Sequence, residues 1–120
     1  MARRCSRPYS GNESLEHFIL KAYMLWLLKQ SGCHWLEFEC YVDGVGFVDV
    51  CGVCAGKRVA VEVCLTCTKG VLRRRVSILK SRGYRVLLVS STCLREVDEC
   101  VDSSTLVDML VRRLVRELEF

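Results

Sequence analysis

One short segment limits the fold more than any other. The run 85–90, RVLLVS, is almost continuously apolar, which is typical of a strand covered on both faces of a sheet. The stretch before it, from about 69 to 82, repeats apolar residues at helical spacing (Leu72, Val76 and Leu79), and Gly83 closes it. A helix that leads into a buried strand predicts an α/β domain, in which helices flank a mixed central sheet.

Three earlier segments, 35–42, 46–53 and 58–65, are strand-like. The first alternates, so we expect its even-numbered residues on one face and its odd-numbered residues on the other. The second and third are rich in valine, and tight turns at Asp43-Gly44 and 55–58 predict a meander of three strands.

Two more helices are expected at the ends of the domain. The first runs from a cap at Asn12 or Ser14 to Gly32 and carries Glu13 and Glu16 in its first turn. After a polar connection over 92–102, the last helix runs from a serine cap to about residue 119. Its apolar residues are predicted to face inward, namely Leu106, Met109, Leu110, Leu114 and Leu118. The order is α-β-β-β-α-β-α, with a basic tail over 1–12 and a single domain over 13–120.

The composition indicates an intracellular protein from a hot environment. No apolar stretch is long enough to cross a membrane, and the basic N-terminus lacks the apolar region of a secretory signal. The chain has nine cysteines but only two side-chain amides, Asn12 and Gln30. Depletion of amides is typical of hyperthermophiles, in which intracellular disulfides occur. We therefore expect a cytoplasmic protein of archaeal or viral hyperthermophilic origin with at least one disulfide.

The net charge of +4 comes with clusters of arginine. These clusters either neutralise nucleic-acid phosphates or form solvated helix faces. Their members are Arg3, Arg4 and Arg7 in the tail, then Arg73, Arg74 and Arg75, then Arg112, Arg113 and Arg116. The first two clusters are the candidate DNA-binding residues.

Two carboxylates occur within valine-rich strands. If the second and third strands pair about the Gly56-Lys57 turn, Asp49 lies opposite Cys64 and Cys51 lies opposite Glu62, all on one face. Burying acids is costly unless they are paired or bind a cation. Carboxylate oxygens suit Mg²⁺ or Mn²⁺, so Asp49 and Glu62 are the candidate metal ligands.

Asp49 followed after a hairpin by Glu62-Val63-Cys64 resembles the core of the PD-(D/E)xK nuclease superfamily. The segments ESLEHFILKAYMLWLLKQSG, WLEFE, VDV, VAVEVCLT and LRRRVSILKSRGYRVLLV are most similar to the nuclease-like part of CoiA-type competence proteins, and more loosely to archaeal Holliday junction resolvases. The resemblance implies a restriction-endonuclease-like fold and metal-dependent cleavage of DNA. It implies Asp49 and Glu62 as ligands, with Glu16, or alternatively Glu13, as an acid from the first helix.

The signature lysine, or glutamine in the CoiA-like variant, is replaced by Cys64. A neutral thiol cannot stabilise the charge that a lysine would stabilise. Lys69 or Arg73 could supply a positive charge instead. Two hypotheses therefore stand together: a metal-dependent endonuclease that uses Glu16, Asp49, Glu62, Cys64 and Lys69, and an inactive nucleic-acid-binding module on the same fold. A domain with two leucine-lined helices could also form a homodimer.

The spacing of four cysteines offers an alternative of another class. Cys51, Cys54, Cys64 and Cys67 form CxxC-x9-CxxC, a pattern typical of Zn²⁺ sites. In the expected register these cysteines lie toward opposite ends of the ladder, which opposes a common zinc site. A zinc-binding regulator is therefore the third hypothesis. His17, which follows Glu16, is either a surface residue or a neighbour of the site.

Overall fold

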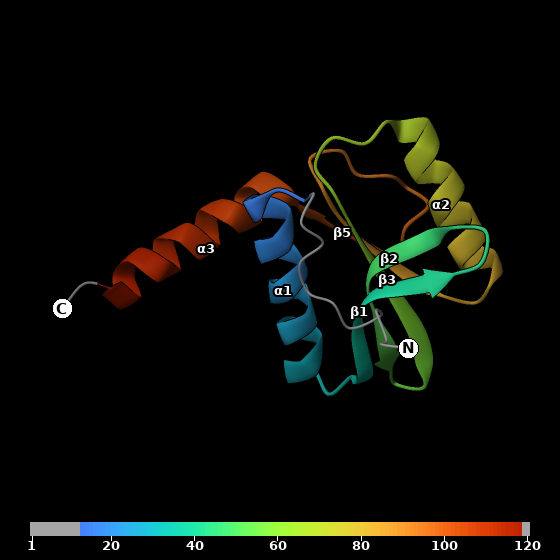
Figure 1. Ribbon diagram of the computed structural model, residues 1–120, viewed down its shortest axis with the longest axis horizontal. Coiled ribbons are helices and arrows are strands. Elements are labelled where there is room, and N and C mark those ends of the chain that lie inside the picture. Colours follow the sequence, from blue (N-terminus) through green and yellow to red (C-terminus); the bar gives the residue numbers. More distant parts are fainter. Residues whose placement is uncertain (1–12, 119–120) are drawn as a thin grey trace, which may run out of the picture.

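In the computed structural model, which describes residues 13–118, the chain forms a five-stranded mixed sheet with helices on both faces (Figure 1). The helices are α1 (Leu15–Gln30), α2 (Lys69–Ser81) and α3 (Ser103–Leu118). The strands are β1 (His34–Val42), β2 (Gly46–Cys54), β3 (Lys57–Cys64), β4 (Arg85–Ser90) and β5 (Glu99–Asp102). The predicted α/β class is confirmed. The tail, with Arg3, Arg4, Cys5 and Arg7, lies outside the described residues.

The strands follow one another across the sheet in chain order. β1, β2 and β3 are antiparallel neighbours, whereas β3 pairs parallel with β4, and β4 parallel with β5. The parallel step from β3 to β4 is made through α2, as a crossover connection requires. β5 was not predicted, because it is only four residues long and lies in a stretch that is polar apart from a few residues.

The hairpin between β2 and β3 closes more tightly than predicted. Cys54 pairs with Lys57 across a two-residue turn in which Ala55 and Gly56 both have positive φ, at 51° and 78°. Such angles are typical of a type I′ turn. The register is therefore displaced by two residues, and Cys51 lies opposite Ala60 rather than Glu62. Because side chains alternate with a period of two, this displacement leaves Asp49 and Glu62 on the face where they were expected.

β1 does not keep the simple alternation that its sequence predicts. Leu36 and Phe38 pack against the core under α1, whereas Val42 belongs to the core under α2. The alternation breaks around Glu39, whose φ is 54°, so even-numbered residues do not all share a face. A non-glycine residue in this region of φ is uncommon and marks a local irregularity in the strand.

The sheet separates two apolar cores. Val59, Val61 and Val63 of β3 face α1 and α3, while Ala60 and Cys64 face α2. β3 is thus buried on both faces, as β4 is, and Glu62 lies within it at 4% exposure. The buried residues on the α1 side are Leu20, Met24, Leu28, Cys33, Val50, Val59, Val61, Val63, Val89 and Leu106. Those on the α2 side are Val42, Val48, Ala60, Cys64, Leu72, Val76, Leu79, Val86, Leu88 and Leu94.

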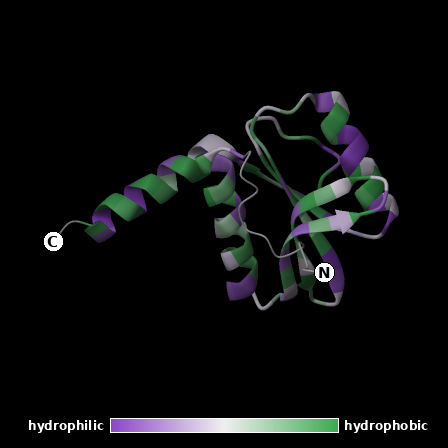
Figure 2. Ribbon diagram, viewed as in Figure 1, coloured by the Kyte–Doolittle hydropathy of each residue, from purple (hydrophilic) through white to green (hydrophobic). Residues whose placement is uncertain are grey.

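The last helix is the clearest departure from prediction. Leu106 is buried and Leu110 is partly buried, but Met109, Leu114 and Leu118 are exposed. α3 extends past the sheet, so its far end has no neighbour to pack against among residues 13–118 (Figure 1). Its apolar residues continue to that end (Figure 2). None of the helices within residues 13–118 has the length and apolar character needed to span a bilayer.

Four disulfides are formed among the described residues, and the predicted use of cysteine in disulfides is confirmed. They join Cys33 to Cys54, Cys40 to Cys51, Cys64 to Cys67, and Cys93 to Cys100. Disulfides on this scale are usual in oxidising compartments as well as inside hyperthermophiles. The intracellular location therefore stays a prediction.

Candidate functional site

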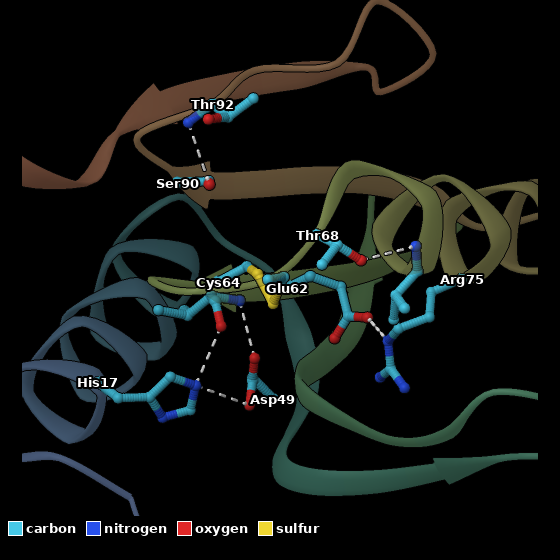
Figure 3. The surroundings of a disulfide bond; sticks show 11 residues. His17, Asp49, Glu62, Cys64, Thr68, Arg75, Ser90 and Thr92 are labelled. Atoms are coloured by element: carbon cyan, nitrogen blue, oxygen red, sulfur yellow. Dashed lines mark hydrogen bonds and ion pairs between the residues drawn. A yellow bond between two sulfur atoms is a disulfide. The ribbon is translucent and has the colours of Figure 1, made fainter.

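A pocket of about 290 Å³ lies where β3 ends and α2 begins. It is lined by His17, Phe47, Asp49, Glu62, Val63, Cys64, Cys67, Val71, Leu72 and Arg75. These residues come from α1, β2, β3 and α2 and from the loop before α2, so segments distant in the sequence meet here. The pocket contains both carboxylates predicted as metal ligands (Figure 3).

Asp49 lies just beyond the point where the β2–β3 ladder ends, at the pair Val50 and Val61. One carboxylate oxygen, Oδ2, accepts the backbone N–H of Val63 at 2.7 Å. The other, Oδ1, lies 3.4 Å from Nε2 of His17 (Figure 3). The carboxylate of Asp49 therefore accepts an N–H group of β3, as a backbone carbonyl of β2 does within the ladder. It also places a negative charge at the pocket.

His17 has an acceptor at each ring nitrogen. Nδ1 lies 2.5 Å from Oε1 of Glu13, and Nε2 lies 3.0 Å from the carbonyl oxygen of Val63. Both nitrogens can donate only if the ring carries two protons. The hydrogen bond to Asp49 is the largest influence and, with help from Glu13 and against burial, raises the pKa of His17 from 6.5 to about 9. The ring is thus a cation at neutral pH.

A second cation is buried beneath it. The ammonium of Lys21 is fully buried and donates to Oε2 of Glu13 at 3.0 Å and to Oε2 of Glu39 at 2.8 Å. Burial opposes this charge, but the two carboxylates outweigh it and raise the pKa of Lys21. Glu13 therefore bridges Lys21 and His17, and the network positions the imidazolium against Asp49.

Glu62 has its own partner on α2. Nε of Arg75 lies 2.5 Å from Oε2 of Glu62, and the same guanidinium donates to the carbonyl oxygens of Val45 and Phe47 at 2.7 Å each. Burial raises the pKa of Glu62, while the hydrogen bond from Arg75 opposes that rise. Arg75 was predicted as a DNA-binding residue of an outer cluster, but its side chain turns into the pocket.

The structure distributes the other predicted residues over the surrounding surface. Glu16 is exposed on α1 beside a second opening, and its alternative Glu13 is the acid that joins the polar network. Lys69 is exposed at the first residue of α2. Arg73 is exposed and pairs with Glu96 at 2.9 Å, and Arg74 is exposed beside it.

The four cysteines of the zinc pattern do not come together. Cys51 and Cys54 are bonded to Cys40 and Cys33, while Cys64 is bonded to Cys67. Three separate disulfides thus occupy the sulfurs that the pattern would offer to one ion, in line with the expected separation of these cysteines along the ladder, and zinc binding stays an alternative hypothesis.

The donors at the pocket do not fit Mg²⁺ as they stand. This ion demands near-octahedral oxygen ligation, and a cation already beside a carboxylate repels it. Here Asp49 faces His17, and Glu62 faces Arg75. Within residues 13–118 no group of three or more histidine, cysteine, aspartate or glutamate side chains could hold a metal ion.

Sequence reasoning did not assign site roles to Lys21 or Glu39, and it assigned Arg75 to DNA binding rather than to the pairing with Glu62. One signal was present, because Glu13, His17 and Lys21 are spaced four residues apart, the spacing of neighbours on one face of a helix. Arg75 gave no comparable signal, since it belongs to a run of three arginines and only the packing of α2 selects one of them.

Comparison with known protein families finds no matching family model, and comparison with curated proteins finds no match either.

Proposed function

We propose that this domain is a nucleic-acid-binding module of nuclease-like design, whose two site carboxylates are neutralised by the protein's own cations. One observation carries the proposal: Asp49 and Glu62 line a single pocket, yet each already has a cationic partner, His17 and Arg75. The order of helix, three-stranded meander, helix and parallel strand supports a restriction-endonuclease-like arrangement. Neutralised acids would repel a phosphate less than bare acids would.

The surface next to the pocket is suited to phosphate. α2 spans KGVLRRRVSILKS and contains cationic side chains but no acid. Its N-terminus faces the pocket, where Val71 and Leu72 of its first turn are lining residues. Helix N-termini attract anions through their free N–H groups and the helix dipole. Lys69 and Arg74 are exposed on the same helix and would hold the backbone of a nucleic acid.

The test is binding of fluorescent duplex, single-stranded and branched DNA across a range of salt. We expect binding with little sequence preference, and a slope of log affinity against log salt of about −0.9 per phosphate contact. Lys69→Ala and Arg74→Ala should each weaken binding and reduce that slope by about one contact. Lys57→Ala is the matched control, because Lys57 is an exposed cation at the opposite end of β3. Absence of binding at low salt, or equal losses in all three variants, would contradict the proposal.

Metal-dependent cleavage of DNA is the second candidate, because two carboxylates lie in one pocket, but it would require Asp49 and Glu62 to exchange His17 and Arg75 for a metal ion. If it occurs, cleavage should require added Mg²⁺ or Mn²⁺ and be lost in Asp49→Asn and in Glu62→Gln. Cys64→Lys, combined with Cys67→Ser because the two sulfurs are bonded, would restore the usual residue and should raise activity. If the wild type and this variant are both inert, the binding function stands alone. The homodimer stays a prediction, which light scattering tests.

A further inference from the structure

We infer that Cys64 and Cys67 form a redox-active pair, which exchanges between disulfide and dithiol with external thiols. This activity goes beyond the proposed binding of nucleic acid. It is carried by the position of the pair, which lies at the pocket between the end of β3 and the start of α2 (Figure 3).

The pair differs from the other three disulfides in the loop it closes. Its cysteines are three residues apart, against 7 for Cys93–Cys100, 11 for Cys40–Cys51 and 21 for Cys33–Cys54. A short loop restricts the unfolded chain least, so its disulfide contributes least to stability. Breaking this bond therefore costs the fold less than breaking any of the others.

The pair is also open to reagents. Both sulfur-bearing residues line the pocket of about 290 Å³ and a second opening of about 670 Å³ on the side of α1. Cys67 is exposed, whereas Cys64 is buried at 3% exposure. An incoming thiol thus reaches Cys67 first, and Cys64 is the internal partner.

The surroundings favour the thiolate form that exchange requires. Cys67 directly precedes Thr68, the residue whose hydroxyl caps the N-terminus of α2. The imidazolium of His17 and the guanidinium of Arg75 line the same pocket as both sulfurs, together with their carboxylate partners Asp49 and Glu62, so the helix N-terminus is the main contribution. Helix N-termini and neighbouring cations lower the pKa of a cysteine thiol, which makes it a better leaving group and raises the fraction of thiolate at neutral pH.

Reduction of the pair by external thiols takes two exchange steps. A thiolate of a low-molecular-weight or protein thiol attacks Sγ of Cys67, a mixed disulfide forms, and Cys64 leaves as a thiolate. A second external thiolate attacks the external sulfur of that mixed disulfide and releases Cys67 as a thiolate. The two protons of the external thiols end on Cys64 and Cys67. The protein disulfide is reduced by two electrons, and two thiols are oxidised to one disulfide.

The first experiment ranks the four disulfides by their rate of reduction. The 120-residue chain with Cys5→Ser, which lacks the ninth cysteine, is treated with limiting dithiothreitol, and freed thiols are alkylated and mapped by mass spectrometry. We expect Cys64 and Cys67 to be alkylated about tenfold faster than Cys93 and Cys100, the matched control with the next shortest loop. Equal or slower reduction of Cys64–Cys67 would overturn the inference.

The second experiment assigns the two sulfurs. In Cys64→Ser, the remaining Cys67 should form a mixed disulfide with glutathione disulfide and have a thiol pKa below the ordinary value of about 8.5. In Cys67→Ser, the buried Cys64 should react about tenfold more slowly with an aromatic disulfide reagent. A Cys67 pKa at or above the ordinary value, or equal reactivity of the two thiols, would show that the pair is structural.

Discussion

Two of the regions that contain disulfides use them differently. In the β1–β2 arm (33–54), two disulfides join residues that are 21 and 11 positions apart and tie the two strands together. In the β3–α2 corner (62–75), one disulfide spans three positions and borders a pocket lined by paired charges. The arm is thus held by covalent bonds that close long loops, while the corner depends on ion pairs and leaves its disulfide accessible.

The difference indicates where the chain can tolerate chemical change. Bonds that close long loops contribute more to stability than bonds that close short ones. A buried ion pair is vulnerable in another way, because removal of one partner leaves a charge without compensation. The corner should therefore be the region where a charge substitution is most damaging and a change of redox state is least damaging.

The largest expected effect is that of Arg75→Ala. This change leaves Glu62 buried and unpaired and removes the donors to the carbonyls of Val45 and Phe47. We expect a loss of about 3 kcal/mol or more in the free energy of unfolding at pH 7, measured with guanidinium. Because burial raises the pKa of Glu62, the deficit should shrink as the pH falls and the acid is protonated.

The matched control for Arg75→Ala is the double variant Arg75→Met and Glu62→Leu. If the stranded charge is the cause, replacing both partners with apolar residues should recover most of the lost stability. A double variant as unstable as Arg75→Ala would show that the carbonyl contacts of Arg75, rather than its pairing with Glu62, hold the corner together.

The next largest effect is the loss of stability when a disulfide is removed, and it can be compared between the arm and the corner. Replacing both Cys33 and Cys54 with serine should lower the free energy of unfolding by about 3 kcal/mol, whereas replacing both Cys64 and Cys67 should lower it by about 2 kcal/mol. Guanidinium denaturation of the two double variants under oxidising conditions measures both losses. A greater loss for the corner pair would reverse the comparison.

Much of this architecture could be predicted from the sequence, because it follows from local patterns. The run 85–90 forms β4 with those bounds, and the valine-rich segments form β2 and β3. The displaced register arose at the turn, where Ala55 accepts a positive φ that is seldom expected of alanine. The amphipathic pattern of α3 was predicted correctly. Periodicity alone cannot show that the helix extends beyond the sheet against which its apolar face would pack.

The site was predicted less completely than the fold. Asp49 and Glu62 could be placed on one face because strand alternation is local and periodic. Their partners could not, since His17 reaches Asp49 from α1 and Arg75 reaches Glu62 from α2. Such contacts depend on how helices dock on the sheet, and a single sequence does not encode that docking in any regular spacing.

A smaller effect is expected from His17→Gln, and it should depend on pH. The pKa of His17 is raised from 6.5 to about 9, so its stabilisation is complete below pH 6.5 and is lost as the pH rises through 9. The wild type should therefore lose about 2 kcal/mol of stability relative to the variant between these limits, after allowance for solvent screening. Denaturation of both proteins across this range measures the difference, and parallel pH profiles would show that the fold does not raise the pKa of His17.

The smallest effect on stability is expected from Arg73→Ala, which separates binding from folding within the corner. Arg73 pairs with Glu96, but the two side chains are 53% and 47% exposed, and an exposed ion pair contributes little. The free energy of unfolding should therefore change by less than about 1 kcal/mol. Affinity for DNA should nevertheless fall, because one cation is removed from the outer surface of α2. Denaturation and a salt titration of DNA binding on the same preparation give both quantities.

If the stability of Arg73→Ala falls as far as that of Arg75→Ala, the corner is held by its whole arginine run. If neither quantity changes, this face of α2 is only a solvated surface, and the basic run contributes nothing to recognition.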